Sequence, residues 1–127
     1  MLTTTYGSDA AFISAGGYHH HIGLNTWFSK DGSPPPRSST GLFHVAILLP
    51  GRKDLAIAYK RLQDVGYPVS GASDHGVSEA LYLEDPDGNG IELYCDRPES
   101  EWPRKPDGSI DMFTRPLDLD GLIREAE

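Results

Sequence analysis

The chain has 127 residues, 38% of them hydrophobic, which suits one globular domain with a single core. Nineteen acidic residues outnumber eleven basic ones, and the formal net charge of −8 repels phosphate backbones and anionic lipids, so we expect no binding to nucleic acid or membranes. A single cysteine excludes an internal disulfide, no apolar run approaches the roughly 20 residues of a membrane span, and the N-terminus lacks a secretory leader, so we expect a cytoplasmic protein.

The first third of the chain predicts a small antiparallel sheet. Short strands over residues 3–6, 10–14 and 18–25 are separated by Gly7 and by the pair Gly16 and Gly17, where turns are expected. From residue 29 to 40 the run SKDGSPPPRSST is too rich in proline for regular structure, because proline lacks the backbone donor that a helix or sheet needs. We therefore assign residues 1–28 to a partial first module and residues 29–40 to a linker.

The second half predicts the order strand, helix, strand, strand, strand over residues 41–96, the second module. GLFHVAILLP is an apolar strand, and RKDLAIAYKRLQDVG repeats apolar residues at helical spacing before Gly66. Residues 67–70, 80–84 and 90–95 are the three further strands, the last two joined by the turn-forming DPDGNG. Because the first third repeats three strands, we expect an α+β fold of paired βαβββ modules, the first lacking its leading strand and helix.

Residues 97–127 are expected to form a tail that wraps the single domain. Four prolines interrupt regular structure until LDLDGLIREAE, where Asp118 can cap a short helix. The apolar face of this helix would carry Leu119, Leu122 and Ile123. The expected anchors of the irregular part are Trp102, Met112 and Phe113.

His44 and Glu92 are the candidate metal ligands. Each is a polar residue inside an otherwise apolar strand, and Glu92 must face the opposite side from Ile91 and Leu93. A carboxylate that points inward is costly unless it meets a cation or hydrogen-bond donors. An imidazole and a carboxylate on neighbouring strands suit Fe²⁺, Mn²⁺, Zn²⁺ or Ni²⁺. A buried His–Glu hydrogen bond and an outward Glu92 are the two structural alternatives.

The run His19, His20 and His21 offers further candidates. In a strand, alternation sends His20 to the face of Ile22 and Leu24, and His21 to the opposite face, which could line a cavity. His21 is therefore the preferred inward histidine. A polar strand end without a function is the alternative interpretation.

His75 and Tyr82 are candidate catalytic residues. His75 follows Asp74 in a loop that enters a strand, where an imidazole could serve a substrate as acid or base. Tyr82 offers a phenolic hydroxyl on the sheet. A surface histidine and a core tyrosine are the ordinary alternatives.

The stretch DPDGNGIELYCD matches part of the spacing of a calcium-binding EF-hand loop. Asp85, Asp87, Asn89 and Asp96 fall at positions one, three, five and twelve of that loop. An EF-hand also needs a helix on each side, whereas here a strand precedes the loop, IELYC lies within it as a strand, and Pro98 follows. We therefore do not expect a calcium site.

The stretches AAFISAGGYHHHIGLNTW, GLFHVAILLP and GASDHGVSEALYLEDPDGNGIELYCDRP together resemble a known family. It is the vicinal-oxygen-chelate superfamily of glyoxalases, bleomycin-resistance proteins and type I extradiol dioxygenases. Within it, the chain most resembles bacterial catechol 2,3-dioxygenase-like proteins. The resemblance covers nearly the whole chain and implies paired βαβββ modules whose sheets curl around a metal ion.

By position, the resemblance implies that His44 and Glu92 are metal ligands. It also implies that His75 and Tyr82 contact the substrate, and that His20 or His21 acts as acid or base. Fe²⁺ or Mn²⁺ is favoured, with Zn²⁺ and Ni²⁺ as alternatives. The family's first metal-binding histidine lies on an opening strand and helix that precede the first residue here, so the site is left incomplete unless His21 or a partner chain supplies the third ligand. The absent strand also exposes a sheet edge, and we expect a homodimer.

These expectations converge on a metal-dependent enzyme that acts on a small catecholic or vicinal-oxygen substrate. The first hypothesis is extradiol ring cleavage, and a glyoxalase-like lyase with Glu92 as base is its variant. The alternative is a protein on the same fold that sequesters a drug or metabolite without catalysis, or a truncated, inactive domain.

Overall fold

The computed structural model describes residues 1–126, in which the chain forms two compact units, residues 1–39 and residues 40–126. The α+β class is confirmed, since both units contain β-sheets and the second also contains the helices. At 13 and 6 residues, the two α-helices in the described part of the chain are too short to cross a bilayer.

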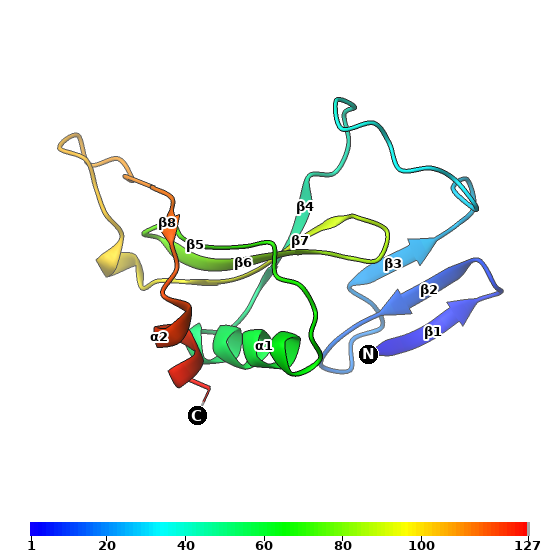
Figure 1. Ribbon diagram of the computed structural model, residues 1–127, viewed down its shortest axis with the longest axis horizontal. Coiled ribbons are helices and arrows are strands. Elements are labelled where there is room, and N and C mark those ends of the chain that lie inside the picture. Colours follow the sequence, from blue (N-terminus) through cyan, green and yellow to red (C-terminus); the bar gives the residue numbers. More distant parts are fainter. Residues whose placement is uncertain (127) are drawn as a thin grey trace. The chain divides into compact units, whose positions relative to one another are not determined.

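The first unit is a three-stranded antiparallel sheet, as the sequence predicts (Figure 1). Its strands, β1, β2 and β3, lie in chain order and cover Leu2–Tyr6, Ala10–Ile13 and Ile22–Asn25. The third strand begins at Ile22 and not at residue 18, because Gly16 and Gly17 both adopt positive φ and the chain does not extend again until after His21. Ala10 and Ser14 are the buried residues of this unit, so its core is small.

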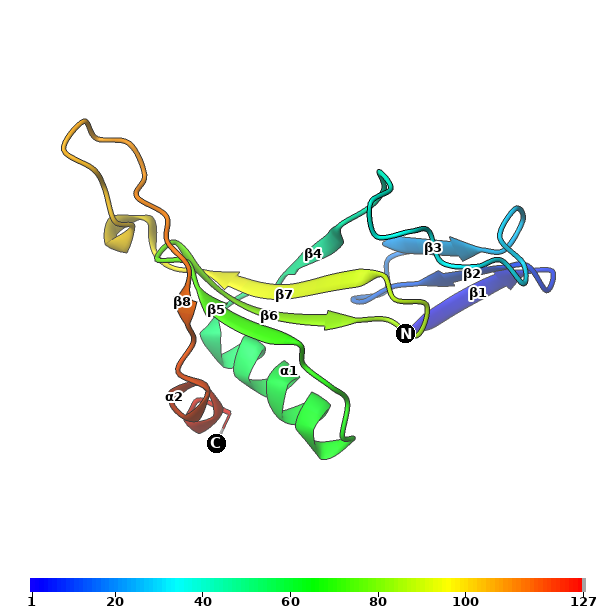
Figure 2. The same cartoon turned by 45° about the horizontal axis from the view of Figure 1, so that its top comes forward.

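The second unit contains the expected strand, helix, strand, strand, strand order (Figure 2). Its sheet has five strands, which cover His44–Leu48 (β4), Gly71–Asp74 (β5), Ser78–Glu84 (β6), Gly90–Asp96 (β7) and Arg115–Pro116 (β8). Their order across the sheet is β4-β7-β6-β5-β8. β4 runs parallel to β7, whereas the other neighbours are antiparallel.

The predicted strand over residues 67–70 is wrong. The next strand after the helix is β5, which begins at Gly71 and pairs with β6 and β8. Pro68 has no N–H to give to a sheet ladder, and Tyr67 instead uses its hydroxyl to donate to the Glu84 carbonyl at 2.6 Å. The segment therefore runs as an irregular connection.

Helix α1 (Arg52–Asp64) connects β4 to the rest of the sheet and has a glycine at each end. Gly66, with φ +67°, donates to the Gln63 carbonyl at 2.9 Å, and Tyr67 donates to the Leu62 carbonyl at 2.8 Å. These bonds satisfy carbonyls that the last helical turn leaves free. The helix ends where the sequence predicts, although Val65 is 76% exposed and does not contribute to the apolar face.

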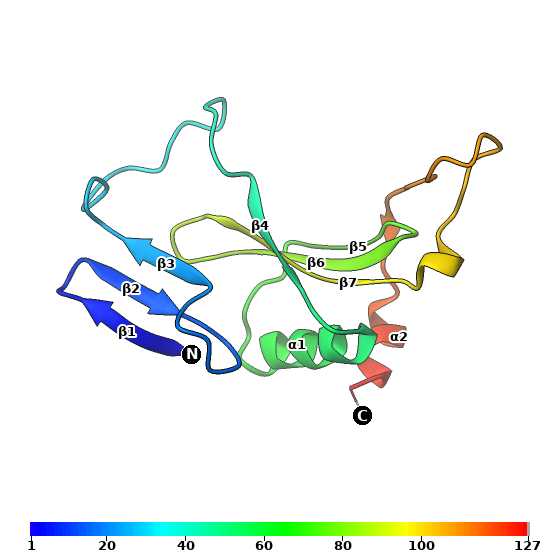
Figure 3. The same ribbon diagram turned by 180° about the vertical axis from the view of Figure 1, so that it is seen from behind.

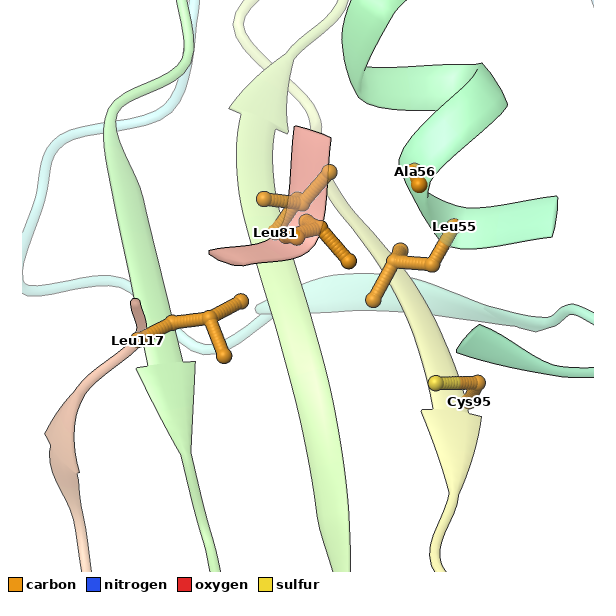
Figure 4. Close-up of a cluster of buried hydrophobic side chains, with 6 residues drawn as sticks. Leu55, Ala56, Leu81, Cys95 and Leu117 are labelled. Carbon is orange, nitrogen blue, oxygen red and sulfur yellow. The ribbon is translucent and has the colours of Figure 1, made fainter. Parts of the chain in front are cut away.

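The core lies between one face of the sheet and α1 (Figure 4). Leu55 and Ala56 of α1 are fully buried against Leu81 of β6 and Cys95 of β7. Burying one leucine fully stabilises the fold by roughly 1.5–3 kcal/mol. Because side chains alternate along a strand, the residues between Leu81 and Leu83 and between Leu93 and Cys95 project from the opposite face.

Glu79 is a buried carboxylate at the helix-facing side of β6 and is only 3% exposed. Its two oxygens accept from Arg52 Nε and from an Arg97 guanidinium nitrogen, both at 2.7 Å. Arg97 also donates to Asp74 at 3.0 Å. Two guanidinium groups thus compensate the buried charge and tie α1, β6 and the segment after β7 together.

The tail contains the 3-10 turn η1 (Glu99–Glu101), β8 and helix α2 (Leu119–Arg124) (Figure 3). Asp118 caps α2 as expected, its side chain accepting from the Gly121 N–H at 2.9 Å. Met112 is 61% exposed, so its predicted role as an anchor is wrong. Leu117 and Leu122 fill the core instead, because they flank the cap that turns α2 onto α1.

Candidate active site

Four of the six predicted site residues lie on one face of the second unit. His44, Tyr82 and Glu92 come from β4, β6 and β7, and His75 directly follows β5. The register accounts for this arrangement, because Glu92 is the partner of both Ala46 and Tyr82, and directly paired residues project to the same side of a sheet. This face is opposite the one that packs against α1.

A continuous chain of polar contacts joins the four side chains. His44 Nε2 lies 3.0 Å from Glu92 Oε2. The Tyr82 hydroxyl donates to Glu92 Oε1 at 3.1 Å and lies 2.8 Å from His75 Nε2. His75 Nδ1 in turn lies 3.0 Å from the Phe113 carbonyl oxygen. Each of the four side chains therefore has its orientation set by the next.

One glycine allows two strands of the site to approach closely enough for these contacts. A Cβ at Gly90 would overlap the Phe43 carbonyl oxygen and lie 2.9 Å from the Cβ of His44. Glycine at position 90 is thus required for the close approach of β4, which carries His44, to β7, which carries Glu92.

Tyr82 remains protonated over the whole physiological range. Burial, together with the hydrogen bond to Glu92 and the charge of that carboxylate, raises the pKa of Tyr82 to about 12. The phenol is thus a hydrogen-bond donor at neutral pH. It fixes the Glu92 carboxylate as an outer-shell partner fixes a metal ligand.

The His44 and Glu92 pair fits a divalent metal ion. Two donors at about 2.1 Å from one ion and about 90° apart lie about 3 Å from each other, which is also the distance of a direct hydrogen bond. The His44 side chain is 31% exposed and that of Glu92 is 14% exposed, so both remain open to an ion from solvent. Among residues 1–126, no three His, Cys, Asp or Glu side chains gather as one metal site.

His20 and His21 belong to the first unit and do not lie in a strand. The predicted alternation of their side chains is therefore wrong, because the residues before Ile22 form an irregular connection. His20 packs against the ring of Phe12 with 4.8 Å between ring centroids. His21 is exposed, and its Nδ1 lies 2.8 Å from the Ser14 hydroxyl. Their assignment as acid or base stays a prediction.

The DPDGNG turn is the tip of the β6–β7 hairpin and has no flanking helices. Asp85 Oδ1 accepts the backbone N–H groups of Asp87 and Asn89 at 2.9 and 2.8 Å. Burial raises the pKa of Asp85, but hydrogen bonds from Asn89, Asp87 and Gly88 outweigh it and the net shift is downward. The aspartate that begins the EF-hand-like spacing thus organises a turn.

Sequence analysis missed the groups around His75. The Phe113 carbonyl and the Thr114 hydroxyl, 3.2 Å from His75 Nδ1, come from a segment without a recognisable pattern. A backbone carbonyl leaves no signal in a sequence. Glu79 was also missed, although it shares the strand face of Leu81 and Leu83 and could have been recognised as a buried carboxylate.

Sequence comparison shows that the chain is similar to proteins named as dioxygenases. The chain is 58% identical over 92 residues to catechol-2,3-dioxygenase of Bacillus subtilis (strain 168), a match that covers 72% of this chain and 32% of that protein. It is 35% identical over 88 residues to biphenyl-2,3-diol 1,2-dioxygenase 3 of Rhodococcus globerulus, covering 67% of this chain and 45% of that protein. The chain thus spans less than half the length of either relative.

Structural comparison finds the same fold in a lactoylglutathione lyase from Agrobacterium tumefaciens. The TM-score is 0.56 at 18% identity, and the match covers 74% of this chain and 73% of the lyase. Residues 3–93 match the family model described as the glyoxalase/bleomycin resistance protein/dioxygenase superfamily. The chain, with its strand, helix and three-strand unit and its row of polar residues on the free face of the sheet, belongs to this superfamily.

Proposed function

We propose that the chain is the metal-binding part of an extradiol-type ring-cleavage dioxygenase that acts on a small catechol-like molecule. The observation that carries this proposal is the 3.0 Å approach of His44 Nε2 to Glu92 Oε2 on the face that also presents Tyr82 and His75. Similarity to proteins named as dioxygenases of catechol and biphenyl-2,3-diol supports the reaction class.

In this proposal, His44 and Glu92 hold a divalent metal ion. One nitrogen and one carboxylate ligand are part of the two-histidine, one-carboxylate set of non-haem iron oxygenases, so Fe²⁺ or Mn²⁺ is favoured over Zn²⁺ or Ni²⁺. When bound, the ion supplies Lewis acidity for two vicinal substrate oxygens and redox chemistry for O₂. Tyr82 holds the Glu92 carboxylate in place through Oε1.

His75 and Tyr82 handle the substrate proton. The Tyr82 hydroxyl proton has two acceptors, Glu92 Oε1 at 3.1 Å and His75 Nε2 at 2.8 Å. When that single proton is donated to Glu92 Oε1, His75 Nε2 is left free to act as a base toward a substrate hydroxyl that approaches Tyr82. We also propose His20 or His21 as a further acid or base.

Metal content tests the ligand assignment. After anaerobic loading with Fe²⁺ and removal of free ion, the protein is expected to retain about one equivalent, whereas His44→Ala and Glu92→Ala each bind at least tenfold more weakly because a direct ligand is lost. His19→Ala and Glu101→Ala remove the same side-chain types elsewhere and should bind like the unchanged chain. Equal metal content in all five proteins would refute the assignment.

Turnover is measured separately from binding. The loaded protein is mixed with catechol in an oxygen electrode, and one O₂ is expected to disappear per catechol, because ring cleavage by a dioxygenase places both oxygen atoms in the product. The His75→Ala variant should retain the metal and lose activity by roughly 10²–10⁴-fold, the usual contribution of an acid–base group. If the protein binds one equivalent of metal but consumes no oxygen, the ligand assignment is retained and ring cleavage by this chain is rejected.

We further propose that two copies of the chain associate as a homodimer. Within the described part of the chain, β4 lies at the end of its sheet with β7 as its one partner strand, so its other edge presents unpaired backbone groups. Leu48 at the end of this strand is 54% exposed. An exposed apolar edge strand is a template for pairing with a second strand.

A further inference from the structure

His75 lies at the junction of β5 and a tight turn that fixes its backbone. Gly76 follows with φ +79° and donates its N–H to Asp74 Oδ1 at 2.8 Å. The His75 N–H donates to the Ser78 carbonyl at 2.9 Å, which closes the turn into β6. The backbone is therefore fixed, and the freedom that remains is that of the imidazole ring.

The Phe113 carbonyl determines which ring nitrogen of His75 carries the proton. A carbonyl oxygen can only accept, so at 3.0 Å from Nδ1 it requires a proton on that nitrogen. In the neutral ring the lone pair is then on Nε2, 2.8 Å from the Tyr82 hydroxyl, and it accepts the phenol proton whenever that proton is not donated to Glu92 Oε1. Phe113 N also donates to the His75 carbonyl at 3.3 Å, so the two residues are linked at two points.

Contacts independent of the imidazole hold Phe113 in place. The ring of Phe113 covers Gly76 so closely that a Cβ at that position would lie 2.6 Å from a ring carbon. The Arg115 guanidinium lies 4.1 Å from the centroid of the same ring. Beyond it, β8 pairs with β5, and Leu117 is buried in the core. The position of the carbonyl is thus set by the tail.

This segment lies outside residues 3–93, the region that matches the family model. We propose that residues 113–114 of the tail form a positioning element that fixes the tautomer and direction of the His75 ring, so that Nε2 is available as a base on the substrate side. Phe113 and Thr114 act through His75 and do not themselves contact the proposed substrate. The role rests on the proposed function, but the tautomer itself can be measured without it.

The test is ¹⁵N NMR of the imidazole groups in the metal-free chain, with the His75 signals assigned by their absence in His75→Asn. In the unchanged chain the neutral His75 ring is expected to be protonated at Nδ1. Phe113→Ala, which removes the packing on Gly76, should shift the population toward protonation at Nε2. Phe113→Leu keeps an apolar group over Gly76 and should restore the Nδ1 form. Met112→Ala alters an exposed neighbour and should change nothing.

A second measurement separates positioning from plain packing. In the loaded protein, Phe113→Ala should lower kcat at least tenfold with KM nearly unchanged, while Met112→Ala keeps both. The inference would be overturned if neutral His75 were protonated at Nε2 in the unchanged chain. It would also be overturned if Phe113→Ala left the tautomer population unchanged. A shifted tautomer with unchanged kcat would overturn it as well. If the chain proves to have no ring-cleavage activity, the NMR result still decides whether the tail fixes the ring.

Discussion

Cys95 shows how burial controls the chemistry of a single residue. The thiol is 2% exposed and packs among Leu55, Ala56 and Leu81 on the helix-facing side of the sheet. Burial, and then the charge of nearby Glu79, raise the pKa of the Cys95 thiol, and Arg52 and Arg97 only partly offset this. Since the thiolate is the reactive form, the native cysteine should be inert at mildly alkaline pH.

We expect a thiol reagent at pH 8 to label the native chain at least tenfold more slowly than the chain in denaturant, which is the internal control. The raised pKa also has a consequence for stability. The raised pKa adds to the free energy of unfolding at every pH below the unfolded thiol pKa of about 8.5. This added stability is lost as pH rises through the higher pKa of the folded state. Native labelling as fast as that of the denatured chain would contradict the buried position.

The residues of the site were predictable where they break a pattern. His44 and Glu92 are polar residues in apolar strands, and the structure brings their side chains together at 3.0 Å. His75 and Tyr82 break no pattern; they were candidates for the chemistry of their side chains alone, and the family resemblance implied their role as substrate contacts. The Phe113 carbonyl was not predictable, because its role depends on a chain reversal of 38 residues that no local pattern describes.

At the scale of elements, the spacing between β4 and β7 depends on Gly90. Gly90→Ala places a methyl group against the Phe43 carbonyl and the Cβ of His44, so β4 must move away from β7. We expect the free energy of unfolding to fall by about 1–3 kcal/mol, as for overpacked cores. Fe²⁺ affinity should fall at least tenfold, because His44 moves with its strand.

Denaturant unfolding and metal binding are measured on the same preparations. Gly41→Ala is the matched control, since a Cβ there meets nothing within 4 Å and its φ is not positive. It should leave both quantities within the ordinary range of surface substitutions, about 0.5 kcal/mol. If Gly90→Ala behaves like Gly41→Ala, the close approach of the two strands does not position His44.

Elements with a strong period were predicted well, and short or proline-containing ones were not. Helix α1 and the β6–β7 hairpin follow from apolar spacing and from the DPDGNG turn. The two-residue strand β8 is too short to have a period. The sequence predicts a strand through the run of three histidines, because the two glycines before it indicate a single break in the chain. In the structure the irregular segment continues to His21.

For the whole molecule, the homodimer proposal predicts a solution mass of twice 13.9 kDa. Light scattering at micromolar concentration is the measurement. Leu48→Lys places a charge at the exposed end of β4 and should shift the mass toward one chain, because lysine on an edge strand opposes pairing. Val65→Lys adds the same charge at another exposed apolar position and should leave the dimer intact. A mass of one chain at every concentration would exclude the dimer.

The α+β class and the order of the second module could be derived from the chain alone. The assignment of residues 1–127 to one domain, with a linker over 29–40, stays a prediction, and the contacts divide the chain at Ser39 into two compact units. Hydrophobic periodicity indicates which face of a helix or strand is buried. It carries no information about how far contacts extend across a proline-rich connection.

Along β6 and β7, odd-numbered residues such as Leu81 and Cys95 pack under α1, while even-numbered ones such as Tyr82 and Glu92 belong to the polar row. One hairpin therefore serves two tasks whose residues are interleaved in the sequence but separated in space. Substitutions at even positions can alter reactivity while the scaffold persists. Among proteins that share such a hairpin, substitutions that change specificity should therefore fall at the even-numbered positions. The odd-numbered positions, which pack in the core, should vary little.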